Sequence, residues 1–96
     1  MLEEAVRNNV NSYKYSFSET LFRLPEKQKE LLIAIAREGD AEALTSGDFV
    51  NKYSLSSPSS VQAALKGLVE KDFVTVEMGV YRVYDKFLAI WLDENY

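Results

Sequence analysis

The chain contains no cysteine and no histidine among its 96 residues. Without cysteine it can form no disulfide bond and carry out no thiolate chemistry, and without either residue type it lacks the usual zinc ligands. The absence of histidine also removes the imidazole that commonly acts as a general base near neutral pH. Functions that depend on these side chains are therefore excluded.

Long hydrophobic runs are also missing, although 47% of the residues are hydrophobic. No apolar segment approaches the roughly 20 residues that a membrane-spanning helix needs. The chain begins Met1-Leu2-Glu3-Glu4 and is acidic there, whereas a secretory signal peptide begins with basic residues. We therefore expect a cytoplasmic protein with no membrane partner, and its length fits one small domain.

Positive charge is scarce, because 15 acidic residues outnumber 11 lysine and arginine residues and give a formal net charge of −4. Domains that bind nucleic acid on their own usually carry a positive field. The deficit is uneven: residues 45–71 hold three lysines and two acidic residues, whereas residues 72–96 hold two cations and five acidic residues. The middle of the chain is thus the least acidic part without being a basic patch.

Catalytic motifs are absent as well. No phosphate-binding GxxxxGK[ST] loop occurs, and the glycines at positions 39, 47, 67 and 79 form no GxGxxG pattern. The Ser-x-x-Lys spacing, which would let a lysine activate a serine nucleophile, is missing too. We therefore expect no enzymatic activity, no metal site and no cofactor in this chain.

The strongest local signal that is present lies in residues 54–71. Ser57 can act as an N-cap, and Pro58 fits the first helical position, where a missing N–H costs nothing. Apolar residues then recur at helical spacing and form one stripe: Val61, Ala64, Leu65, Leu68 and Val69. This pattern predicts a tight turn followed by a helix over residues 57–71.

Residues 1–24 contain neither glycine nor proline and carry apolar side chains at steps of three and four, which is typical of an amphipathic helix. A capping box at Ser16-x-x-Glu19 leaves open whether this is one long helix or two shorter ones. The apolar stripe either packs on the domain that follows or forms an interface with another domain or a second copy. As an interaction stripe it would consist of Val10, Tyr13, Phe17 and Leu21.

Two helices are expected between residues 25 and 53. Pro25 and Gly39 bound the first, whose centre is apolar nearly all round, so it should be the most buried helix of the fold. The loop 40–44 carries no motif. Thr45-x-x-Asp48 then resembles a capping box and predicts a short second helix.

A hairpin is expected over residues 73–84, because alternating apolar residues flank the two-residue loop Met78-Gly79. That loop length forces the pairs 77/80, 76/81, 75/82, 74/83 and 73/84. Asp85 is a plausible N-cap for a closing helix, and Trp91 on that helix should pack in the core or against the N-terminal helix.

Together these elements predict a mostly α-helical fold with a small β-hairpin, which is a winged helix-turn-helix. It would consist of a three-helix core, a two-stranded wing, an N-terminal helical segment at residues 1–24 and a short C-terminal helix. We expect the winged helix-turn-helix domain itself to span residues 25–96.

If this domain binds double-stranded DNA, the helix 57–71 would enter the major groove. Glutamine can pair with adenine and alanine can contact a thymine methyl group. The candidate nucleic-acid-binding residues are Lys52, Ser59, Ser60, Gln62, Ala63 and Lys66.

The sequence also resembles a known family over roughly residues 12 to 92. The residues that carry the resemblance are Leu24-Pro25, Leu55-Ser56-Ser57-Pro58-Ser59-Ser60-Val61, Tyr81-Arg82-Val83-x-Asp85 and Trp91-Leu92. They are similar to the C-terminal winged-helix domain of archaeal and bacterial AAA+/STAND-type P-loop ATPases. The resemblance implies that this chain is a fragment, that residues 1–24 are the tail of a helical lid, and that ATP and Mg²⁺ belong to a missing core.

Two functions follow from the resemblance. Related origin-recognition ATPases use such a domain to grip duplex DNA, whereas in STAND ATPases an equivalent domain often packs on the nucleotide-binding core. We therefore expect a non-catalytic module that contacts double-stranded DNA in the full-length protein. The alternative is a regulatory module that docks on its own ATPase core or forms a homo-oligomer.

Overall fold

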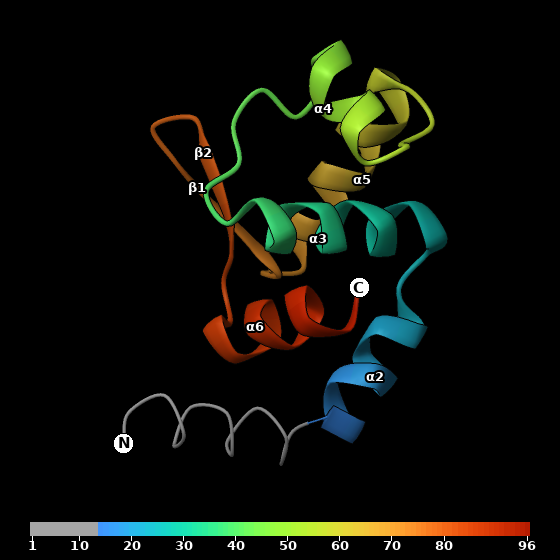
Figure 1. Ribbon diagram of the computed structural model, residues 1–96, viewed down its shortest axis with the longest axis vertical. Coiled ribbons are helices and arrows are strands. Elements are labelled where there is room, and N and C mark those ends of the chain that lie inside the picture. The colour runs from blue at the N-terminus through green and yellow to red at the C-terminus, as the bar shows by residue number, and fades with distance from the viewer. Residues whose placement is uncertain (1–13) are drawn as a thin grey trace.

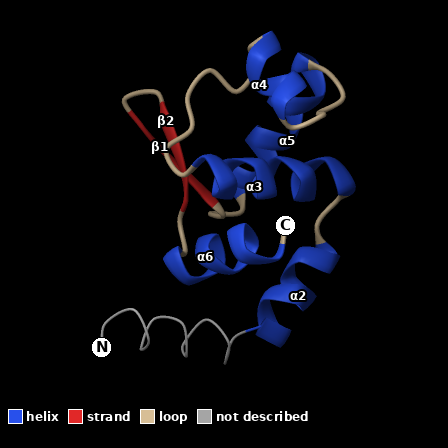
Figure 2. Ribbon diagram, in the orientation of Figure 1, coloured by secondary structure: helices blue, strands red, loops and turns tan. Residues whose placement is uncertain are grey.

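The computed structural model describes residues 14–96. In chain order its elements are α2 (Lys14–Arg23), α3 (Glu26–Glu38), α4 (Gly47–Lys52), α5 (Pro58–Glu70), β1 (Val74–Glu77), β2 (Val80–Val83) and α6 (Lys86–Asn95). Figure 1 shows their arrangement and Figure 2 separates helix from strand. The described chain is mostly helical with a two-stranded antiparallel hairpin, which confirms the expected fold class.

Helix α3 lies at the centre of the molecule. It packs against α5 on one side, α6 on the other and β2 near its C-terminal end. Leu32 and Ile35 are completely buried, because a helix that is apolar nearly all round can be covered from several directions. Gly39 ends α3, as the sequence predicts, with a positive φ of 83° that favours glycine.

One hydrophobic cluster runs through every helix and both strands. No polar or charged residue is buried among the described residues, so burial of apolar side chains holds these elements together. The cluster consists of Phe17, Leu21, Leu24, Leu31, Leu32, Ala34, Ile35, Ala36, Ala41, Leu44, Phe49, Val50, Val61, Ala64, Leu68, Val74, Val83, Leu88, Trp91 and Leu92.

The helix-turn-helix starts one residue later than the sequence suggests. Ser46, rather than Thr45, is the N-cap of α4, because Ser46 has the extended backbone that a cap requires and its Oγ accepts the Phe49 N–H at 3.2 Å. The start of α5 is as predicted: Ser57 Oγ accepts the Ser60 N–H at 3.1 Å.

The hairpin has the predicted register, with Val74 opposite Val83 and Glu77 opposite Val80. The loop 40–44 differs from expectation, since Ala41 forms a β-bridge with Tyr81. The Ala41 N–H donates to Tyr81 O at 2.9 Å, and the Tyr81 N–H donates to Ala41 O at 2.8 Å. A single bridging residue has no alternating pattern, so the sequence offers no signal for it.

Helix α2 packs on the rest of the domain. It continues through Ser16, so that residue does not restart the helix. Phe17 and Leu21 are buried, and the Phe17 ring lies 5.8 Å from the Trp91 ring. The sequence allows the N-terminal stripe either to pack on the domain or to form an interface. Phe17 and Leu21 pack on the domain. Val10 and Tyr13 lie outside the described residues.

The hydrophobic core therefore crosses the domain boundary expected at residue 24. Leu21 from the N-terminal segment belongs to the same cluster as Leu32 and Trp91. An interface through Phe17 and Leu21 would require α2 to leave this core.

The packing of α2 can be tested with two phenylalanines on that helix. Phe17 is 8% exposed, whereas Phe22 is 87% exposed. Phe17→Ala should lower the free energy of unfolding by about 3 kcal/mol, because it leaves a cavity in the core. Phe22→Ala should change it by less than about 0.5 kcal/mol. Urea denaturation followed by tryptophan fluorescence measures both, and equal effects would contradict the packing of α2.

Candidate nucleic-acid interface

Helix α5 has two distinct faces. Its inward face buries Val61, Ala64 and Leu68 in the core. Its outward face exposes Ser59, Gln62, Ala63, Lys66 and, at the end of the helix, Glu70. The inward residues hold the helix in place by packing. The outward residues are not needed for this packing, so they are available to a ligand.

Ser60 belongs to the cap of α5 rather than to its outward face. It is half-buried, and the Ser57 hydroxyl donates to Ser60 Oγ at 3.1 Å. Of the five candidate contact residues on α5, the structure thus brings four together on one exposed face and places Ser60 beside the turn.

The outward face carries one acidic residue, the exposed Glu70 that ends α5. Residues 49–69 contain no aspartate or glutamate, in a chain with 15 acidic residues. Lys66 makes no ion pair with any described residue, and Glu70 lies one turn farther along the helix. The next lysine, Lys71, donates to Gln28 Oε1 at 2.8 Å and ties the end of α5 to α3.

Lys52 lies at the end of α4 and forms an ion pair with Glu38. Its Nζ lies 3.1 Å from Glu38 Oε2, which also accepts a hydrogen bond from the Tyr53 hydroxyl. The pair joins the end of α4 to the end of α3. Of the predicted nucleic-acid-binding residues, Lys52 is therefore the one whose charge another residue already balances.

These contacts shift three pKa values. The hydrogen bonds from Tyr53 and then Lys52 lower the pKa of Glu38, and the hydrogen bond to Glu38 raises the pKa of Lys52. Burial, followed by the hydrogen bond to Glu38, raises the pKa of Tyr53. All three shifts favour the ionised pair with a neutral tyrosine.

A cation that sequence reasoning missed lies beside the start of α5. Lys27, in the first turn of α3, donates from Nζ to Ser56 Oγ in the turn before α5, and the Glu30 carboxylate is 3.8 Å from its Nζ. No local pattern could reveal this contact, because 29 residues separate Lys27 from Ser56.

The wing has no cation at its tip. Met78 is 97% exposed there and has φ 52°, between the exposed Glu77 and Gly79. Arg82, farther along β2, pairs with Asp40 at 2.5 Å. The wing therefore offers an apolar and acidic tip rather than a phosphate contact.

Two further features are absent from residues 14–96. In this part of the chain, no group of three or more histidine, cysteine or acidic side chains could hold a metal ion. No helix of the described chain has both the length and the apolar character to cross a membrane.

A comparison with known families gives one match. The model of the family described as "Probable winged helix domain" matches residues 15–94, from α2 to α6. No curated protein and no solved structure matches the chain. The description of the family states a fold and no activity, so the relation to an ATPase stays a prediction.

The pKa shifts of the Glu38 pair predict a pH dependence. The folded-state pKa of Glu38 lies below its ordinary 4.5, so the carboxylate's contribution is full above pH 4.5 and is lost as the pH falls through the folded-state value. The raised pKa of Lys52 means that its contribution is full below its ordinary 10.5 and is lost as the pH rises through the folded-state value.

At pH values between the pKa of Glu38 and that of Lys52, Glu38→Gln should therefore lower the urea concentration at the unfolding midpoint. The difference from wild type should shrink as the pH falls. Urea denaturation at pH values from about 3 to about 7 measures this. A difference of the same size throughout would show that charge is not the stabilising factor.

Proposed function

This chain belongs to the winged-helix family whose model it matches, and we propose that it is a non-catalytic module that contacts double-stranded DNA through α5. The observation that carries the proposal is the outward face of α5, on which Ser59, Gln62, Ala63 and Lys66 are exposed and the single acidic residue, Glu70, comes only at the end of the helix. In helix-turn-helix proteins the second helix of the motif lies in the major groove, and α5 occupies that position after α4.

The side chains on this face suit a close approach to bases. Ser59 and Ala63 are small, so the backbone of α5 can enter the groove deeply. Gln62 makes no hydrogen bond to another described residue, which leaves its amide free to pair with the N6 and N7 atoms of adenine. Ala63, beside it, could contact a thymine methyl group.

Phosphate contacts would come from two lysines. Lys66 lies on α5 itself, and Lys27 lies next to the turn that begins α5. Each phosphate neutralised by a lysine releases counterions, so two lysines provide only a small part of the affinity usual for such domains. We therefore propose that the module binds DNA weakly alone and works within a larger protein or an oligomer.

The resemblance to AAA+/STAND ATPases supplies one such larger protein. In that proposal ATP and Mg²⁺ bind to a separate core, and this module adds DNA contact to it. Protein docking is the second candidate function, and the wing favours it, because its tip carries Met78 and Glu77 instead of a cation.

DNA contact can be tested by fluorescence anisotropy of a labelled duplex at about 50 mM and about 200 mM salt. Binding should weaken with salt, and Lys66→Glu should abolish it. Lys86→Glu is the matched control, because Lys86 lies at the start of α6, makes no ion pair with a described residue and changes the net charge equally. Absence of binding at the lower salt, or equal losses in both variants, would contradict the proposal.

A second comparison separates the two remaining lysines. Lys27→Gln should weaken DNA binding and reduce the salt slope by about 1, because it removes one phosphate contact. Lys52→Gln should have the smaller effect, because the pair that Lys52 makes with Glu38, at 3.1 Å, is closer than the 3.8 Å pair between Lys27 and Glu30. Anisotropy titrations at several salt concentrations measure both slopes, and a larger effect of Lys52→Gln would place the interface nearer to α4.

A further inference from the structure

The tip of the wing combines two unusual features. Met78 is the most exposed large hydrophobic side chain described, at 97%, and it has φ 52°. The next residue, Gly79, also has a positive φ, of 79°, so the turn has the left-handed form that favours asparagine, aspartate or glycine at its first central position. A methionine there is conformationally disfavoured as well as exposed, and such positions cluster at functional sites.

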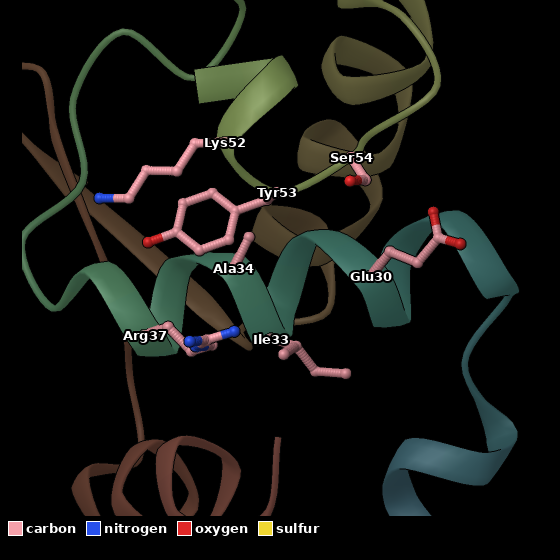
Figure 3. A pocket seen from close by; sticks show the side chains of 7 residues that line it. All are labelled: Glu30, Ile33, Ala34, Arg37, Lys52, Tyr53 and Ser54. Atoms are coloured by element: carbon pink, nitrogen blue, oxygen red, sulfur yellow. The ribbon is translucent and has the colours of Figure 1, made fainter. Parts of the chain in front are cut away.

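A hollow that could receive an apolar side chain lies between α3 and α4. Its volume is about 300 Å³, and Figure 3 shows the residues that line it. Ile33 contributes apolar surface from one edge of α3, and the Tyr53 ring lies over the buried Ala34 on the other. The hollow is open to solvent and contains no α5 residue in its lining.

The rim of this hollow is electrically asymmetric. Arg37 and Lys52 lie toward one end of the hollow and Glu30 lies at the other. Glu30 and Arg37 are seven residues apart on α3, which corresponds to about 10 Å along the helix axis. Glu38 already balances Lys52. Arg37, in contrast, makes no ion pair with a described residue, so its positive charge is the uncompensated one at that end.

The wing tip and the hollow are complementary in shape and in charge. Met78 provides a single flexible apolar side chain, and the hollow provides apolar and aromatic walls for it. Glu77, next to Met78, is exposed and negative, whereas Arg37 is free and positive. Arg37 sets the orientation, because Glu30 is paired with Lys27 and Lys52 with Glu38, whereas Arg37 makes no ion pair with a described residue.

We propose that this chain associates with a second copy of itself by inserting the Met78 tip of one wing into the α3–α4 hollow of the other. Glu77 of the inserted wing then pairs with Arg37 of the receiving copy. This gives the docking function a specific partner and surface, and it leaves the outward face of α5 uncovered.

The contact is small, so the association should be weak and concentration-dependent. Two wings inserted reciprocally would close a dimer, whereas insertion in one direction would add further copies head to tail. Either form uses the same residues and depends on the same two contacts.

The test is analytical ultracentrifugation of the full chain, without DNA, from about 10 μM to about 1 mM, the range in which weak contacts become populated. The wild type should associate as its concentration rises. Met78→Asn should raise the dissociation constant about tenfold or more, because the apolar side chain is lost. Asparagine suits the left-handed turn, so this variant should resist urea at least as well as the wild type.

Charge reversal provides the specific control. Glu77→Arg and Arg37→Glu should each weaken association, and an equimolar mixture of the two variants should recover it, because the reversed tip then meets a reversed rim. Lys86→Glu, on α6, should associate like the wild type. A wild type that stays monomeric at all concentrations, a Met78→Asn variant that associates normally, or a mixture that recovers nothing would overturn the proposal.

The outcome is separable from that of the DNA proposal. Lys66→Glu should retain self-association while it loses DNA binding, and Met78→Asn should behave in the opposite way. The two variants therefore show which of the two proposals fails, because one reports on DNA binding and the other on self-association.

Discussion

The burial of α3 is the constraint on which the other features of this domain depend. Its apolar residues, among them Leu32 and Ile35, are covered by α5, α6 and β2 together, so none of these elements could leave without exposing hydrophobic surface. The same helix carries charged side chains on its exposed edge. Lys27 lies near its start and Arg37 near its end, so one packed helix positions both a neighbour of α5 and the rim of the α3–α4 hollow.

The charged side chains of the domain fall into two groups, those that pair with a nearby carboxylate and those that do not. Arg23, Lys27, Lys52 and Arg82 each pair with a nearby carboxylate, which leaves their charge locally balanced. Lys66 and Arg37 make no ion pair with a described residue, and they lie on different surfaces. A protein with a net charge of −4 can therefore still present one face suited to an anionic ligand and a separate cation suited to an acidic one.

The wing has a packed base and an exposed tip. Its strands are held by the core through Val74 and Val83, and the bridge from Ala41 to Tyr81 supports β2 from the other side. The tip, beyond these contacts, has no packing duty. The exposed side chain of Met78 therefore adds nothing to the core and faces the solvent.

Local chemistry decided much of the fold. The cap at Ser57, the stripe of α5 and the register set by the Met78-Gly79 loop depend on residues close together in the chain, and each is as the sequence predicts. The outward face of α5 also followed from helical periodicity. The tertiary structure alone decided which charges are balanced, that Lys27 reaches Ser56, that Phe17 packs near Trp91 and that a hollow lies beside Arg37. These contacts join residues far apart in the chain, and only the packing around α3 brings them within reach of one another.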